Sequence, residues 1–307
     1  MHISNTDELN KTFGLGGKIR FITENKLIKF IATSKASVLE GYLQGAHITS
    51  FIPKDSSDVL WLSPIAKFEH GKAIRGGIPI CWPWFGKHPV DTSFPQHGFA
   101  RNSLFEVAQT AELNNGDLQI ILSMQESEAS LKLWPYKFKL NLIITFGASL
   151  SIELKTENTD SQTFTISEAI HSYFAIKDIS TTQLQGLENT PYYDQLLESD
   201  TRQANSATKF DQEVDRIYRA PVNELFILRE GLAKTRIQQV HGNAVVVWNP
   251  WIEKAKSMGD FPDNGFSQML CIEAANTRYG SIILAPGEHH SITQIITPRR
   301  LAELGPV

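Results

Sequence analysis

The sequence lacks the features that would place it among several specialised classes of protein. Its 307 residues include only two cysteines, Cys81 and Cys271, and no Cys-x-x-Cys pair, so we expect two buried thiols rather than a disulfide framework or a zinc or redox site. No stretch approaches the roughly 20 apolar residues of a membrane span. Residues 1–8 lack the charged-then-apolar order of a signal peptide. We therefore expect a protein of the reducing cytoplasm with no membrane partner.

An excess of charge of one sign is also missing. The chain has 29 Lys+Arg and 33 Asp+Glu, a formal net charge of −4, and no cluster of five basic residues, so we expect no nucleic-acid partner. The glycine-rich residues 14–17 do not form a complete dinucleotide-binding fingerprint, and the sequence has no Walker-type Gly-Lys-Ser/Thr for nucleotide binding. It also has no zinc-ligand spacing and no Gly-x-Ser-x-Gly of a serine hydrolase. We expect no cofactor and no metal.

Helical periodicity is scarce, whereas alternation of apolar and polar residues is strong. It runs through residues 136–146 and, after Gly147, resumes over 150–154, which predicts a hairpin of two half-buried strands. Similar short runs occur at 104–108, 118–123, 164–176, 244–248, 269–275, 281–284 and 291–297. One helix is predicted over 126–134, where Pro135 ends it.

This pattern predicts a mainly β protein. The sequence has no linker-like composition, no repeat of 20 to 50 residues and no βαβ alternation. We predict a single large antiparallel β-sandwich that spans residues 1–307 as one domain, and we expect a monomer.

The most unusual composition lies in residues 70–101. A Gly-Gly pair follows Arg75, prolines at 79, 83 and 95 stiffen the loop, and Arg101 ends it. The two arginines are suited to hold a phosphate or a carboxylate through forked N–H groups, and Trp82, Trp84 or Phe85 would offer a flat surface to a sugar ring. The alternative is that the tryptophans anchor the loop and the arginines are ordinary surface residues.

Two strand-like runs each carry a titratable residue suited to proton transfer. His171 shares a strand face with Tyr173, and its ordinary pKa near 6.5 suits a proton donor. Glu273 interrupts the apolar run 269–275, where burial would raise its pKa toward that of a general base. The alternatives are a histidine of the core or surface, and a glutamate in an ion pair or at a sheet edge.

Together, six segments resemble the glucose-6-phosphate 1-epimerases, or hexose-6-phosphate mutarotases, of the aldose 1-epimerase superfamily. The resemblance extends over roughly residues 37–297. The segments are RGGIPICWPWFG (75–86), QHGFAR (96–101), IHSYF (170–174), EVDRIY (213–218), VWNPW (247–251) and CIE (271–273). The first of them is the most specific.

The resemblance implies a supersandwich of antiparallel strands that interconverts the α and β anomers of glucose 6-phosphate or another hexose 6-phosphate. It assigns catalysis to His171 and Glu273, with the small-molecule substrate contacted by Arg75, Gln96, His97, Arg101 and Asp215. The arginines would form a phosphate clamp. Two alternatives stay open: an epimerase of unphosphorylated aldoses, and a carbohydrate-binding sandwich without turnover.

Overall fold

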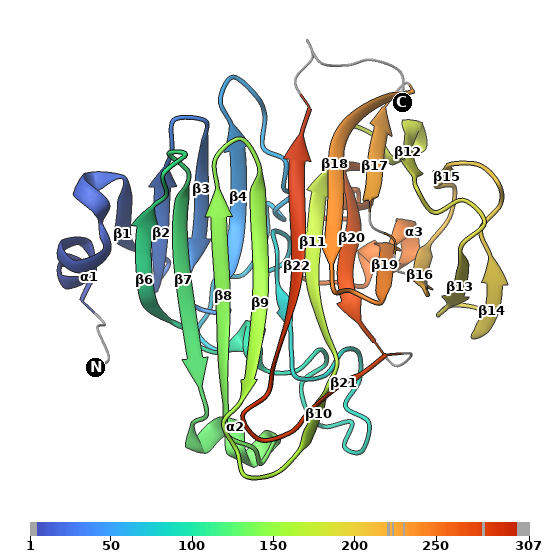
Figure 1. The fold of residues 1–307 in the computed structure, drawn as a ribbon. Coiled ribbons are helices and arrows are strands. Elements are labelled where there is room, and N and C mark those ends of the chain that lie inside the picture. The colour runs from blue at the N-terminus through green and yellow to red at the C-terminus, as the bar shows by residue number, and fades with distance from the viewer. Residues whose placement is uncertain (1–4, 220–221, 223, 230, 278–279, 300–307) are drawn as a thin grey trace.

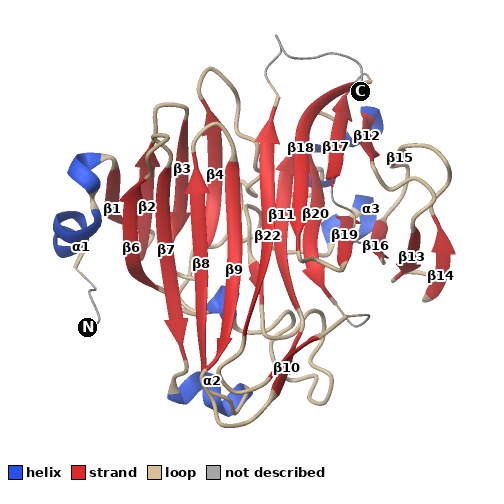
Figure 2. Cartoon of the chain, viewed as in Figure 1, coloured by secondary structure: helices blue, strands red, loops and turns tan. Residues whose placement is uncertain are grey.

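The chain folds into two layers of antiparallel strands, as Figures 1 and 2 show. A computed structural model describes residues 5–219, 222, 224–229, 231–277 and 280–299. The helices are short: α1 (Thr6–Phe13), α2 (Glu128–Leu133) and α3 (Trp251–Lys256), with the 3₁₀ turns η1 (Leu15–Gly17), η2 (Ala100–Asn102), η3 (Ile179–Thr181) and η4 (Gly265–Gln268). None of the helices in these ranges is long and apolar enough to cross a membrane.

One layer is a nine-stranded sheet with the order β15-β12-β17-β18-β22-β9-β8-β7-β6. In chain order its strands are β6 (Glu106–Glu112), β7 (Leu118–Gln125), β8 (Phe138–Phe146), β9 (Leu150–Asn158), β12 (Thr182–Gln185), β15 (Thr208–Lys209), β17 (Glu224–Arg229), β18 (Leu232–Val240) and β22 (His289–Pro298). Every second residue of β8 and β9 is buried, because only one face of these strands meets the core. The predicted hairpin is confirmed.

The other layer contains a seven-stranded and a four-stranded sheet. The larger has the order β14-β13-β16-β19-β20-β11-β5, and the smaller runs from β1 to β4. Isolated bridges join residues of β4 and β11 to the segment between β4 and β5. The strands are β1 (Ile19–Glu24), β2 (Leu27–Thr33), β3 (Ser37–Tyr42), β4 (His47–Pro53), β5 (Ile80–Cys81), β11 (Glu168–Ala175), β13 (Pro191–Asp194), β14 (Ser199–Arg202), β16 (Val214–Tyr218), β19 (Ala244–Asn249) and β20 (Met269–Asn276).

The main core lies between the layers, where side chains such as Phe30, Ile48, Leu142 and Ile272 form one buried cluster. Strand β20 is buried at all of its residues and β11 at all but its last. These central strands are therefore covered on both faces, one by the nine-stranded sheet and the other by loops and α3. Cys81 and Cys271 are buried free thiols, as predicted.

Two elements predicted from the sequence differ in their bounds from those in the structure. The run 164–176, predicted as one strand, forms β10 (Phe164–Ile166) and β11, and β10 pairs instead with β21 (Ile282–Leu284). The break falls at Ser167, whose backbone N–H donates to Pro83 O and whose Oγ accepts from Phe85 N–H. The predicted helix 126–134 is the shorter α2, which Ser127 caps through the N–H of Ser130.

The mainly β, sandwich-like fold is confirmed. Because 1–4 and 300–307 lie outside the described residues, the single domain 1–307 stays a prediction.

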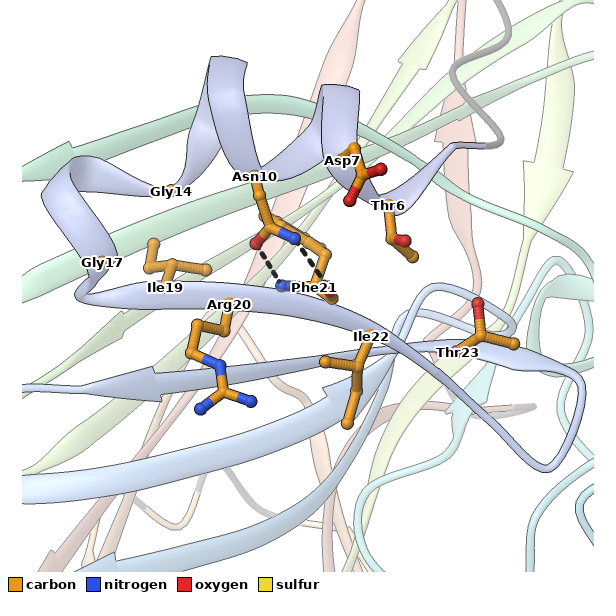
Figure 3. A pocket seen from close by; sticks show the side chains of 10 residues that line it. All are labelled: Thr6, Asp7, Asn10, Gly14, Gly17, Ile19, Arg20, Phe21, Ile22 and Thr23. Carbon is orange, nitrogen blue, oxygen red and sulfur yellow. Dashed lines mark hydrogen bonds between the residues drawn. The ribbon is translucent and has the colours of Figure 1, made fainter.

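Helix α1 lies against β1 at the edge of the molecule. The side chain of Asn10 donates to the backbone oxygen of Phe21 and accepts from its N–H, each at 2.8 Å. Figure 3 shows these two bonds and the shallow pocket beside them, to which Arg20 and Asp7 contribute. None of the predicted site residues lines this pocket.

Candidate active site

The two candidate proton-transfer residues lie on neighbouring strands. Strands β11 and β20 are antiparallel, and their register places His171 directly opposite Glu273. Successive residues of a strand point to opposite faces, and Ile170 and Ile272 occupy the face that packs in the core between the layers. His171 and Glu273 therefore project from the other face, where Nε2 and Oε1 are 3.3 Å apart.

All seven predicted site residues line one pocket of about 370 Å³ on that outer face. Three strands and one loop bring them together: β11, β20, β16 with Asp215, and the two ends of the loop 75–101. Other lining residues are Phe85, Gly86, Tyr173, Gln195, Val246, Trp248, Lys254 and Met258. The segments 75–101, 168–175, 214–218 and 269–276, far apart in the chain, thus meet at one place.

Close backbone approaches hold the loop 75–101 in position. Gly77 has φ 63°, and a Cβ there would collide with Ile48 O; Gly98 has φ 74°, and a Cβ there would collide with Trp82 O. Only glycine combines a positive φ with this proximity at little cost. The chain can therefore return past Trp82 and present His97 and Arg101 to the pocket.

The tryptophans of this loop are anchors and do not reach the pocket. Trp82 is fully buried and donates its indole N–H to Thr156 Oγ1 at 2.9 Å, and Trp84 is 5% exposed and donates to Pro95 O. The prediction that either would offer a surface to a sugar is wrong, because both indoles are needed in the core and each is already hydrogen-bonded. Phe85 does line the pocket.

The two arginines are held differently. Arg75 donates from Nε to Asp260 Oδ1 at 3.1 Å and from Nη1 to Tyr173 Oη at 3.3 Å. Arg101 donates from Nη2 to Gln96 O at 2.7 Å. Its buried Nε has no hydrogen-bond partner, and it forms no ion pair with an acid in the described part of the chain. Arg75 is thus fixed and charge-balanced, whereas the positive charge of Arg101 is uncompensated.

Burial and positive neighbours keep the two imidazoles of the pocket neutral. His97 accepts from Gly86 N–H at Nδ1, and burial, followed by Arg101 and Arg75, lowers its pKa to about 3. The ring of His171 stacks on Tyr173, with centroids 4.9 Å apart, and meets the His97 ring edge-on at 6.0 Å. Burial, His97 and the two arginines together lower the pKa of His171 well below its usual value.

The carboxyl groups shift in the opposite direction. Glu273 is 2% exposed; burial, and then the charge of Asp215, raises its pKa well above the usual value. Burial also raises the pKa of Asp215, to about 6, although its hydrogen bond from Gln195 opposes this. His171 and Glu273 therefore share about one proton as a pair. His171 Nδ1 and Glu273 Oε2 are buried without a hydrogen-bond partner among the described residues, so both atoms remain available to a ligand in the pocket.

Several pocket residues were not among those predicted. Trp248 stands in one of the resemblance segments and faces the rings of His171 and Tyr173 edge-on, with centroids 6.3 and 6.0 Å away. Lys254 belongs to α3, and Gln195 follows β13. Neither gives a signal in the sequence, because a lysine on a short helix and a glutamine in a loop are ordinary surface residues.

A model of the aldose 1-epimerase family matches residues 30–297. The chain belongs to the aldose 1-epimerase family. A Cenchrus ciliaris protein named as a candidate glucose-6-phosphate 1-epimerase is 37% identical over 259 residues, which cover 81% of this chain and 78% of the relative. An Escherichia coli relative of the same name is 34% identical over 235 residues, covering 76% and 78%.

The similarity extends to the three-dimensional structure of this aldose 1-epimerase family member. The crystal structure of a candidate mutarotase, YeaD, from Salmonella typhimurium superposes with a TM-score of 0.86 at 28% identity, covering 95% of this chain and 99% of the other. The mutarotase-like sandwich and the family predicted from the sequence are both confirmed. The chain is thus an isomerase of a family that acts on sugars.

Proposed function

We propose that this chain interconverts the α and β anomers of hexose 6-phosphates, glucose 6-phosphate among them, with His171 and Glu273 as the acid–base pair. The observation that carries the proposal is the cross-strand contact of 3.3 Å between these side chains, in a pocket that Arg75 and Arg101 also line. The names of the relatives point to the same substrate. We also expect the enzyme to be a cytoplasmic monomer.

The reaction needs only the movement of protons. Glu273, as a carboxylate, takes the proton of the anomeric hydroxyl while His171, as an imidazolium, gives one to the ring oxygen, and the C1–O5 bond opens to the aldehyde. Rotation about C1–C2 turns the other face of the carbonyl to O5. The reverse transfers then close the ring as the second anomer and restore both groups.

The one proton of the pair must move from Glu273 to His171 before the reaction begins. Burial favours the neutral forms, and the charges of Arg101 and Arg75 oppose protonation of His171. A bound phosphate dianion would compensate these charges and so raise the pKa of His171. The substrate would thereby generate the reactive ion pair, which an uncharged sugar would do less well.

The arginines would hold the phosphate through N–H groups that the protein leaves free. A guanidinium has five N–H donors, of which Arg75 uses one each for Asp260 and Tyr173. These two contacts orient the group. Arg101 brings an uncompensated charge, and charge-assisted hydrogen bonds to phosphate are among the strongest in proteins. Asp215, Gln96 and His97 would contact the sugar hydroxyls.

Anomer-exchange NMR on glucose 6-phosphate and on glucose tests the substrate. We expect Arg101→Ala to raise KM for glucose 6-phosphate by about 10- to 100-fold, the equivalent of one charged hydrogen bond, with little change for glucose. Lys132→Ala, an exposed cation on α2, serves as the matched control. Equal losses on both sugars would favour an epimerase of unphosphorylated aldoses. Binding of glucose 6-phosphate without any faster exchange would favour a carbohydrate-binding protein.

A further inference from the structure

A second, larger pocket lies at one end of the sandwich, away from the site described above. Its volume is about 640 Å³, and it shares no lining residue with the active-site pocket. The loop after β4, the end of β11, the starts of β12 and β18 and the ends of β17 and β22 form its walls. Figure 1 shows the ends of β17 and β22 and the start of β18 in the upper part of the molecule. Both layers contribute, so the pocket opens where they separate.

Four cations line this pocket: Lys177, Arg229, Lys234 and Arg299. Within the described residues, none of them forms an ion pair with an acid. The one acid among the described lining residues is Asp58, whose Oδ1 already accepts from the backbone N–H groups of Phe51 and Leu60. The lining therefore carries an excess of positive charge, in a protein whose overall charge is negative.

The two guanidinium groups among these cations, those of Arg229 and Arg299, have N–H donors that are not used within the described residues. Arg229 Nε is buried and has no hydrogen-bond partner in the described part of the chain, which costs stability unless a ligand satisfies it. The guanidinium of Arg299 lies over the ring of Phe226, with its centre 5.3 Å from the centroid. This stacking holds the group in place and leaves its N–H edges available, as at many phosphate sites.

The rest of the lining is apolar or bears hydroxyl groups. Val59, Ile176, Ile227 and Pro298 provide an apolar surface, and Ser56 and Ser57 stand at its margin. A volume of this size is typical of sites for small molecules, which pair an apolar wall with a few polar groups that fix orientation. A purely inorganic anion would leave the apolar wall unused.

We propose that this pocket binds an organic phosphate, with the phosphate between Arg229, Lys234 and Arg299 and the organic part against Val59, Ile176 and Ile227. The site is independent of the proposed catalytic function. Its chain segment Ala175–Lys177 nevertheless directly continues β11, the strand that carries His171.

NMR of the ¹⁵N-labelled full chain tests the site residue by residue, with phenyl phosphate as the probe. We expect saturable shifts of the Ser57 and Lys177 amides in the wild type and in the control Lys132→Gln/Lys137→Gln, which alters two exposed cations elsewhere. Arg229→Gln/Lys234→Gln should weaken binding at these amides at least about tenfold, through the loss of two charged contacts. The thermal stability of this variant, measured alongside, should be no lower than that of the control, and its anomer exchange should be no slower.

The same spectra keep the two sites apart. Amides of His97 and Arg101 report the active-site pocket in a parallel titration with glucose 6-phosphate, so the absence of shifts there rejects the proposed phosphate clamp and leaves this proposal intact. Shifts confined to those amides, or equal affinity in Arg229→Gln/Lys234→Gln and the control, would overturn the second site. Inorganic phosphate should bind more weakly than phenyl phosphate, and equal binding would reject the role of the apolar wall.

Discussion

Strand β11 contributes one residue to each of two close histidine–glutamate pairs, one pair on each of its faces. On the outer face His171 Nε2 lies 3.3 Å from Glu273 Oε1; on the inner face Glu168 Oε1, on β11, lies 3.2 Å from His290 Nε2. Both glutamates are almost fully buried. By distance and by the burial of the glutamate the two pairs are alike, although the His290 side chain is 18% exposed and that of His171 is 10% exposed.

Their surroundings differ. Asn276, opposite Glu168 in the register, donates to Glu168 Oε1 at 3.0 Å and contacts His290 Nε2 at the same distance. The inner pair is therefore tied into the packing between the layers, and neither of its members lines the active-site pocket. The outer pair lacks such support and faces two arginines and a pocket. An unpartnered buried oxygen does not separate the pairs, because Glu168 Oε2 and Glu273 Oε2 both lack a hydrogen-bond partner among the described residues. A buried His–Glu contact thus indicates catalysis only where it faces a pocket.

The largest effect is expected from a substitution in the outer pair, which should lower the rate of anomer exchange. Glu273→Gln keeps the shape of the side chain and removes the proton acceptor, so anomer exchange on glucose 6-phosphate should fall by about 10² to 10⁴-fold. Because an ionised Glu273 is penalised by burial, the thermal stability of this variant should equal or exceed that of the wild type. Exchange NMR and calorimetry check the two statements. Exchange near the wild-type rate would remove Glu273 from the mechanism.

A substitution in the inner pair should instead lower stability and leave the rate of anomer exchange unchanged. Glu168→Ala leaves the Asn276 amide and His290 without their acceptor, so the free energy of unfolding should drop by about 1–3 kcal/mol. The exchange rate per folded molecule should stay close to that of the wild type. Urea unfolding and exchange NMR at 15 °C, where the variant remains folded, measure both. A collapse of exchange in folded Glu168→Ala would mean that the inner pair takes part in catalysis.

A smaller effect concerns pH. Burial raises the pKa of Asp215 from its ordinary 3.8 to about 6, and its charge in turn raises the pKa of Glu273. In Asp215→Asn the acidic limb of the kcat/KM profile should therefore move to lower pH, even if the plateau falls. An unmoved limb would show that Asp215 does not act on the pair.

The same group predicts a pH effect on stability. The folded state keeps a proton on Asp215 that the unfolded chain releases between about pH 4 and 6, so this group's contribution to the free energy of unfolding decreases as pH rises through that window. Asp215→Asn should lack this decrease. Unfolding curves at pH 4.5 and 7, compared between wild type and variant, measure the difference.

The sequence predicted strands of both kinds, those buried on one face and those buried on both, such as β20, predicted as 269–275. Strands β8 and β9 alternate strictly, so the hairpin could be read directly from the residues. The run 164–176 gave no sign of its break at Ser167, because it is apolar on both sides of that residue. The strands of the four-stranded sheet, β1 to β4, were not singled out. Their burial is less regular and β3 contains a register shift near Gly41.

For the site, the sequence supplied the candidates but not their supports. His171 and Glu273 stood out as titratable residues in apolar runs, and the resemblance added the five contact residues. The partner of Arg75, Asp260, lies 185 residues further along the chain, and nothing local marks it. The role of Trp82 could not be predicted either, because an indole beside prolines suits an anchor and a ligand platform equally well.

The spacing of acid and base is a property of the sheet itself. His171 and Glu273 are register partners on adjacent strands, so backbone hydrogen bonding sets their separation and no loop takes part. Apart from side chains of β16 and β19, such as Asp215 and Trp248, the other groups that line the pocket come largely from the loop 75–101, the segment after β13 and α3. Insertions and substitutions in those segments can retune which sugar is accepted while the reaction centre stays intact. An architecture of this kind lets one family diversify its substrates without reinventing its chemistry.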